Sequence, residues 1–242
     1  MIEMKKSVLL TGATSGIGLA IGRRLASEGY LVFGLGRNTE KVGELPEHFR
    51  LTKCDITDTE ALLATVKQIH EQLHGYPDIV IHCAGVAYYG LQENLSDSQV
   101  KELFRTNLEA PVLLTTHLLQ PWKQRGYGHF VFLSSVTAEK TNPHGAAYGA
   151  AKAALTSFAG SLFEEVRKNG IKVTVLQPDM TQSDLYRNAD FTADETACLF
   201  PEDIAETISF LLAAPEHLVT TKLTMQPQRH RIKKKERNLQ GQ

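Results

Sequence analysis

The sequence has few cysteines, no excess of charge of either sign and no long apolar run. Its three cysteines, Cys54, Cys83 and Cys198, lie far apart and show neither a metal-ligand spacing nor a disulfide framework. The 26 lysines and arginines against 27 acidic residues leave a net charge of -1, which gives no general attraction to nucleic acid or membranes. We therefore expect no metal site, no nucleic-acid or membrane partner, and a cytoplasmic location.

Long apolar stretches are missing as well. The apolar residues after Lys5 and Lys6 stop at a glycine-rich turn, so they are too few for the apolar core of a signal peptide. No run approaches the length of a transmembrane helix, and we find no repeat and no low-complexity linker. With 242 residues, 42% of them hydrophobic, the chain is long enough for one large α/β domain.

Strand-like and helix-like segments alternate along the chain. Apolar runs that suit buried strands are expected at 7–10, 30–35, 50–53, 78–83, 129–134, 171–177 and 218–225. Helical spacing is expected at 16–28, 59–73, from 96 to beyond 107, 146–167 and 201–214. This alternation predicts a doubly wound parallel sheet of about seven strands with helices on both faces, in a single Rossmann-type domain over residues 1–228.

Two segments fall outside this alternation. Residues 181–200 have no clear period, and a loop of that length in a compact domain is often a lid, here over the substrate. Residues 229–242 are basic and lack a core pattern, so we expect a solvated, frayed tail. A nucleic-acid contact is the less favoured interpretation, since short terminal runs of charge are usually just solvated.

A glycine-rich turn joins the first predicted strand to the first helix. Gly12, Gly16 and Gly18 are spaced four and then two residues apart within it. Such a turn places backbone N–H groups and the positive end of a helix dipole where a pyrophosphate can bind. Glycine has no Cβ, so the phosphates can approach the backbone closely. An ordinary strand-to-helix turn is the alternative interpretation.

The end of the second strand bears on cofactor choice. In a dinucleotide-binding fold, this strand end meets the adenosine ribose, where an acid selects NAD and an arginine accommodates the 2′-phosphate of NADP. Arg37 follows the strand directly, and the nearby acid Glu40 suits the first turn of a helix. We predict NADP as the cofactor, with NAD less favoured. The alternative is that Arg37 is a surface arginine at a strand end.

Tyr148 and Lys152 lie four residues apart in a predicted helix and therefore share one face. A tyrosine hydroxyl has an ordinary pKa of about 10, too high for efficient proton transfer near neutrality, and a nearby ammonium would lower it. Ser134 and Ser135 end the fifth strand, at the edge of the sheet where ligands bind. Each feature alone is common, since turn serines and chance pairs on helices are frequent.

Together these residues resemble the motifs of the classical short-chain dehydrogenases/reductases, and the resemblance extends to about residue 212. It rests on the turn at 11–18, on Ala84-Gly85, and on Tyr148-Gly149-Ala150-Ala151-Lys152, with Ser135 at the family's usual distance before Tyr148. The resemblance implies an NADP(H)-dependent oxidoreductase that interconverts a small-molecule carbonyl compound and its alcohol by hydride transfer. It also implies a homodimer or homotetramer formed through the helices around Asn107 and Tyr148.

The resemblance assigns roles to individual residues. Tyr148 would be the general acid or base, and Ser135 would hold the substrate oxygen. Lys152 would lower the pKa of Tyr148 and bind the nicotinamide ribose, and Asn107 would connect Lys152 to solvent through water. The implied cofactor contacts are Gly12, Thr14, Ser15, Gly16, Ile17, Gly18, Arg37, Asp55, Ile56, Ala84, Gly85, Tyr148, Lys152, Pro178, Met180 and Ser183.

The substrate side is expected to combine catalytic and loop residues. If the family's arrangement holds, the residues there are Ser135, Tyr148, Tyr88 with its neighbour Tyr89, His144 and Arg187. For each loop residue among them, a side chain that faces water is the alternative. The lid would contribute from residues 181–200.

Three residues depart from the family's pattern. His82 and Cys83 stand where the family has two asparagines, so we expect altered packing of the central strand, with Cys83 as an inert core thiol. Asp179 replaces a glycine after Pro178, and it either points to solvent or tunes the site. These departures favour one alternative function, an NADP(H)-binding sensor or scaffold with little catalytic activity.

Overall fold

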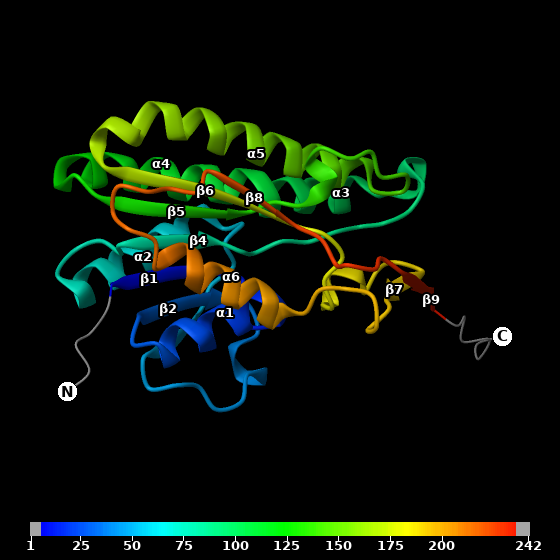
Figure 1. The fold of residues 1–242 in the computed structure, drawn as a ribbon, viewed down its shortest axis with the longest axis horizontal. Coiled ribbons are helices and arrows are strands. Elements are labelled where there is room, and N and C mark those ends of the chain that lie inside the picture. The colour runs from blue at the N-terminus through cyan, green and yellow to red at the C-terminus, as the bar shows by residue number, and fades with distance from the viewer. Residues whose placement is uncertain (1–5, 236–242) are drawn as a thin grey trace.

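The computed structural model describes residues 6–235, in which strands and helices alternate (Figure 1). The strands are β1 (Ser7–Thr11), β2 (Leu31–Gly36), β3 (Phe49–Lys53), β4 (Ile79–His82), β5 (Gly128–Leu133), β6 (Ile171–Pro178), β7 (Phe191–Ala193), β8 (Lys222–Met225) and β9 (Ile232–Lys234). The α-helices are α1 (Gly16–Ser27), α2 (Thr59–Leu73), α3 (Asp97–Phe104), α4 (Ala110–Arg125), α5 (Ala146–Val166) and α6 (Pro201–Leu212). Within the described residues, no helix is both long and apolar enough to cross a membrane.

Seven strands form one parallel sheet in the order β3-β2-β1-β4-β5-β6-β8, which confirms the predicted doubly wound fold. Side chains alternate across each strand, so Leu9 joins the core under α2, α4 and α5, while Val8 and Leu10 join the core under α1 and α6. Figure 1 shows α4 and α5 over one face and α1 and α6 over the other. From β1 the chain adds strands outward on one side, β2 and β3, and from β4 onward it adds them on the other side. Ligands bind in such sheets in the crevice at this switch point between β1 and β4.

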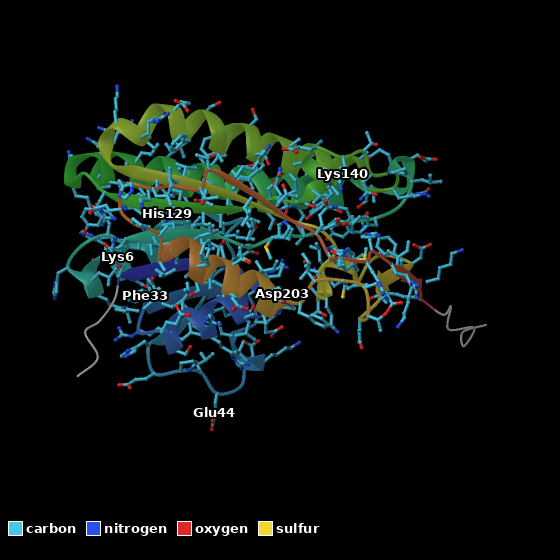
Figure 2. The ribbon with its side chains drawn as sticks, in the orientation of Figure 1. Lys6, Phe33, Glu44, His129, Lys140 and Asp203 are labelled. Atoms are coloured by element: carbon cyan, nitrogen blue, oxygen red, sulfur yellow. The ribbon has the colours of Figure 1, made fainter. Side chains whose placement is uncertain are left out.

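Capping side chains begin several helices at the positions that the sequence predicts. The carboxylate of Asp58 accepts a hydrogen bond from the Ala61 N–H at 3.0 Å and caps α2. At the start of α6, Asp203 accepts a hydrogen bond from the Phe200 N–H at 2.8 Å (Figure 2). The helical stretch from Ser96 holds a π-helical turn, Arg105–Glu109, before Pro111. Proline cannot donate the backbone hydrogen bond that a regular helix needs there, which fits the wider π-helical turn before Pro111.

The prediction of a frayed basic tail is wrong for Ile232–Lys234. These residues form β9, which pairs antiparallel with β7 inside the loop predicted as a lid, although their side chains are exposed. The loop is therefore more ordered than its lack of period suggests, and it also holds a 3-10 turn, Asp184–Tyr186. Residues 236–242 of the predicted tail lie outside the described residues.

Candidate active site

A cleft lies at the carboxyl ends of the central strands. All of the predicted cofactor residues except Met180 line it. Met180 is buried instead in a small apolar cluster within the loop after β6, beside Tyr186 and Cys198. Residues from widely separated parts of the sequence therefore meet in one site, because the parallel strands end at the same edge of the sheet.

The glycine turn between β1 and α1 forms one wall of the cleft. Gly12 has a φ of +74°, and a Cβ there would lie 2.6 Å from the Ala84 Cα, so no other residue fits this turn without movement. The side chain of Ser15 makes no capping hydrogen bond, and the first turn of α1 holds no acidic residue. The backbone N–H groups at this helix start therefore fit an anionic pyrophosphate, which supports a dinucleotide in the cleft.

The end of β2 forms the region where an adenosine ribose would lie. A Cβ at Gly36 would lie 2.4 Å from the Thr14 Cγ2, so Thr14 fills the space beside the last residue of the strand. Arg37 follows, and its Nη1 lies 3.3 Å from Oε1 of Glu102 on α3. Although burial opposes it, hydrogen bonds from Thr57 and the charge of Arg37 lower the pKa of Asp55, which lies on the same side of the cleft.

The helix α5 places Tyr148 and Lys152 against the end of β5. Ser135 lies near enough to Tyr148 to oppose the rise of its pKa, and its Oγ accepts a hydrogen bond from the Thr137 N–H at 3.2 Å. The neighbouring Ser134 faces elsewhere, with its hydroxyl 3.1 Å from the Lys152 carbonyl and 2.7 Å from the Thr156 hydroxyl. Ser134 lines the cleft and Ser135 does not, so the choice of Ser135 rests on the family resemblance and on the bonds that already engage the Ser134 hydroxyl.

The electrostatics of this pair differ from the prediction. Burial raises the pKa of Tyr148, and Tyr186 raises it further, while Ser135 opposes the shift. Lys152 does not contribute to lowering it, because its ammonium donates to the Leu133 carbonyl at 2.8 Å and lies 5.7 Å from the centroid of the Tyr148 ring. Burial lowers the pKa of Lys152 itself to about 8.

Asn107 lies in the π-helical turn and is fully buried. Its Nδ2 donates to the carbonyls of Val86 at 2.7 Å and Leu103 at 2.9 Å. Its Oδ1 is buried with no hydrogen-bond partner among the described residues. A Cβ at Gly85 would lie 2.9 Å from this Oδ1 and 3.7 Å from the Lys152 Nζ, so only a glycine leaves the space beside both polar groups free of a side chain.

The predicted substrate residues divide into two groups. Arg187 lines the cleft, with Leu185 beside it, whereas Tyr88 and His144 do not. The Tyr88 hydroxyl donates to Glu102, and the side chain of His144 is exposed. The next residue, Tyr89, does not line the cleft either, but its ring packs beside that of Tyr148. The sequence could not distinguish the two tyrosines because they are adjacent in a loop.

Tyr89 belongs to a cluster of aromatic rings beside Tyr148. The centroid of its ring lies 6.0 Å from that of Tyr148, 5.8 Å from that of Tyr186 and 5.2 Å from that of Phe191. Tyr186 and Phe191 come from the loop after β6, so this cluster joins that loop to the site. The aromatic residues of the loop give a signal in the sequence, but their partner Tyr89 is too distant in the chain for a pattern to reveal.

The residues that depart from the family's pattern have structural roles. His82 stacks on Phe132 with 4.7 Å between ring centroids, its Nε2 lies 3.0 Å from the Thr115 hydroxyl, and burial lowers its pKa to about 3. Burial raises the pKa of the Cys83 thiol to about 12, which disfavours a reactive thiolate, but Cys83 is half-buried and lines the cleft instead of lying wholly in the core. The carboxylate of Asp179 accepts hydrogen bonds from the Met180 N–H and from Nε2 of Gln226, so it faces the C-terminal segment.

Comparisons with known proteins agree with this geometry. The family model described as short chain dehydrogenase matches residues 6–193. An uncharacterised oxidoreductase of Staphylococcus haemolyticus is 29% identical over 236 residues, which cover 94% of this chain and 100% of that protein. The crystal structure of serine dehydrogenase from Escherichia coli has a TM-score of 0.80 at 25% identity and covers 91% of this chain and 97% of that one.

A metagenomic short-chain oxidoreductase in complex with NADP is 26% identical, with a TM-score of 0.77 and coverage of 92% of this chain and 96% of that one. The family model spans well over half of the chain, and the fold, the cleft and the cofactor turn agree with it. The chain therefore belongs to the short-chain dehydrogenase family and is an NAD(P)-dependent oxidoreductase.

Proposed function

We propose that this enzyme uses NADP(H) to interconvert a small carbonyl compound and its alcohol, with Tyr148 as the general acid or base. One observation supports the proposal: Tyr148 lies beside the buried Lys152, with 5.7 Å from Nζ to the centroid of its ring, in the same cleft as the glycine turn. Asn107, Ser135, Tyr148 and Lys152 form the proposed catalytic set.

The bound nicotinamide would supply a hydride to the carbonyl carbon, or accept one from the alcohol. Tyr148 gives its phenolic proton to the carbonyl oxygen as negative charge develops there. Ser135 positions the same oxygen, because its Oγ already accepts from the Thr137 N–H and its own hydrogen is left to donate. The raised pKa of Tyr148 keeps the phenol protonated near neutrality, as a general acid requires.

The Lys152 amine and the Asn107 Oδ1, which lie beside Gly85, would take part in resupplying the proton that Tyr148 gives up. With a pKa of about 8, the Lys152 amine is mostly an ammonium near neutrality, so it would hold a proton that can be returned to Tyr148. The unpartnered Oδ1 of Asn107 would hold a water that connects Lys152 to solvent. Lys152 would also hold the nicotinamide ribose.

The preference for NADP rests on Arg37. No acid ends β2, Thr14 fills the space beside Gly36, and the guanidinium of Arg37 reaches the cleft, where its planar fork suits a phosphate. The related metagenomic oxidoreductase that was solved with NADP supports the same choice. NAD is the less favoured cofactor.

We also propose a cytoplasmic homodimer or homotetramer. The solvent-facing side of α5 carries small exposed residues, Ala150, Ser157, Gly160 and Ser161, on which a helix of a second copy could pack closely. The association would use α4 and α5, as the family resemblance implies.

The proposed reaction is tested with Tyr148→Phe, which removes only the hydroxyl. We expect NADPH-dependent reduction across a panel of small aldehydes, ketones and keto acids to fall by a factor of about 10² to 10⁴, with the Kd for NADPH within about twofold. The exposed Tyr127→Phe is the matched control and should keep full activity. Wild-type rates in Tyr148→Phe would contradict the mechanism, and tight NADPH binding with no turnover of any compound would indicate a sensor instead.

A further inference from the structure

The C-terminal residues 226–235, here called the strap, are attached to residues 179–200, here called the substrate loop. The strand β9 of the strap pairs with β7 of the loop, with Phe191 opposite Lys234 and Ala193 opposite Ile232. Further backbone bonds extend this ladder at both ends, from the Asp194 N–H to the Arg231 carbonyl and from the Lys235 N–H to the Asp190 carbonyl. Figure 1 shows the two strands side by side at one end of the molecule.

Side chains of the strap hold the loop on both sides of this ladder. The Lys235 ammonium donates to the backbone carbonyls of Tyr186 at 2.7 Å and Arg187 at 3.2 Å. At the start of the loop, Nε2 of Gln226 donates to Oδ2 of Asp179 at 2.9 Å. The strap therefore fixes both the beginning of the loop and its middle.

The charges of the two segments are complementary. The loop holds five acidic residues and one arginine, and its acids are Asp179, Asp184, Asp190, Asp194 and Glu195. The strap has no acid and five basic residues, Arg229, Arg231, Lys233, Lys234 and Lys235. The Lys233 Nζ lies 3.5 Å from Oδ1 of Asp194, which is nearly fully buried. Attraction between such segments favours their association.

The substrate loop, which the strap holds, also contacts the active site. Its residues Leu185 and Arg187 line the cleft, and its rings Tyr186 and Phe191 pack on Tyr89. Tyr89 in turn packs on Tyr148. A displacement of β7 would therefore move the aromatic cluster beside the proposed general acid. Ser183 of the same loop lies against the glycine turn, where a Cβ at Gly16 would be 3.5 Å from the Ser183 Cβ.

We propose that the strap is a positioning element of the active site: by holding the substrate loop, it keeps Tyr186 and Phe191 against Tyr89 and so forms the wall that meets the substrate beside Tyr148. It determines how well the carbonyl substrate binds and has a smaller effect on the cofactor, which the same loop reaches through Ser183. This inference rests on the proposed function, in which Tyr148 faces that substrate.

Two proline variants distinguish the effect of the β7–β9 hydrogen bonds from the effect of removing a lysine charge from the strap. Hydrogen-bonded and non-hydrogen-bonded pairs alternate along an antiparallel ladder, so the bonded pairs Asp194–Arg231 and Asp190–Lys235 place the Lys233 N–H toward Thr192. By the same alternation, the Lys234 N–H points away from β7. Lys233→Pro therefore breaks the ladder, whereas Lys234→Pro removes the same charge and leaves the ladder intact.

Hydrogen exchange measured by mass spectrometry on the full chain tests the attachment. In Lys233→Pro, we expect the amides of residues 191–194 to exchange about tenfold faster than in the wild type, and those of residues 86–90, which include Tyr89, to exchange faster as well. In Lys234→Pro, both peptides should exchange as in the wild type. Unchanged exchange in Lys233→Pro, or faster exchange confined to residues 191–194, would overturn the proposal.

Kinetics with 9,10-phenanthrenequinone and NADPH test the functional part. We expect the KM for the quinone to rise about fivefold in Lys233→Pro, which is more than the Kd for NADPH rises. In Lys234→Pro both values should stay within about twofold of the wild type. Faster exchange with an unchanged KM would show that the strap only stabilises the fold, which contradicts the inference. If the wild type binds NADPH without reducing the quinone or the carbonyl panel, the proposed function fails, while the exchange at residues 86–90 still decides whether the strap supports the wall.

Discussion

Arg37 forms an ion pair with Glu102, with 3.3 Å between Nη1 and Oε1, at the edge of the cleft where the adenosine ribose would lie. Glu102 also accepts a hydrogen bond from the Tyr88 hydroxyl, which fixes its carboxylate. Both charged side chains are partly exposed, so the pair itself contributes only about 0–1 kcal/mol to stability. Its importance is for binding, because a phosphate held by Arg37 would lie close to the negative charge of Glu102.

Arg37→Ala should weaken NADPH binding selectively. The loss of one charge-assisted contact to a phosphate corresponds to about 1.5–3 kcal/mol, or a rise of about 10- to 150-fold in the Kd for NADPH. The Kd for NADH, which has no 2′-phosphate, should stay within about twofold. Titration by nucleotide fluorescence measures both values, with the exposed Arg23→Ala as a control. An equal effect on the two cofactors would mean that Arg37 does not select NADP.

Glu102→Gln should have the opposite effect. The substitution removes a negative charge near the expected phosphate but keeps the size of the side chain and an acceptor for Tyr88. We expect the Kd for NADPH to fall about threefold at low ionic strength, with a smaller change in 1 M salt, where the charges are screened. Weaker NADPH binding in this variant would show instead that Glu102 orients Arg37 for the phosphate.

Patterns among neighbouring residues were enough to predict the parallel sheet, its helices and the cofactor side of the cleft. The apolar runs, the Asp58 cap and the glycine turn are each specified by neighbouring residues, so the parallel sheet and the cofactor side of the cleft followed from the sequence. Since parallel strands end at one edge of a sheet, even the meeting of Gly12 with Lys152 could be expected.

Contacts between distant polar segments could not be predicted in this way. The strands β7 and β9 are three residues long, the side chains of β9 are exposed, and backbone hydrogen bonds and charge hold the pair. Neither strand shows the apolar alternation that marks a buried strand, so the basic end of the chain suggested a solvated tail. The sequence also predicted a lowered pKa for Tyr148, whereas its pKa is raised. Burial, to which the ring of Tyr89 contributes, and the electrostatic effect of Tyr186 cause this rise, and both residues come from other segments.

Asn107→Ala should destabilise the fold as well as slow the reaction. The carbonyls of Val86 and Leu103 would lose the donor that Nδ2 supplies in the buried π-helical turn. At about 1–3 kcal/mol for each of the two buried groups left unsatisfied, we expect the free energy of unfolding in urea to fall by about 2–6 kcal/mol. Thr116→Ala, which removes an exposed bond within α4, should cost less than about 1 kcal/mol. Equal losses in the two variants would contradict a structural role for the Asn107 amide.

The buried histidines should make the protein sensitive to acid. Burial lowers the pKa of His82 to about 3, and His129 on β5 (Figure 2) is shifted to a similar value. Below the ordinary histidine pKa of about 6.5, the unfolded chain takes up a proton that the folded His82 does not. The unfolded state therefore binds more protons, so stability falls as the pH drops from about 6.5 toward 3.

His82→Asn isolates one of these contributions. Linkage at one site with these two pKa values predicts that, between pH 7 and pH 5, the wild type loses about 2 kcal/mol more unfolding free energy than the variant does. Urea denaturation at both pH values measures the difference, and a loss of stability at pH 7 from altered packing does not affect it. His217→Asn, at an exposed position after α6, should leave the pH dependence as in the wild type. An identical pH dependence in the wild type and His82→Asn would mean that His82 takes up its proton in the folded state despite its position between Phe132 and Thr115.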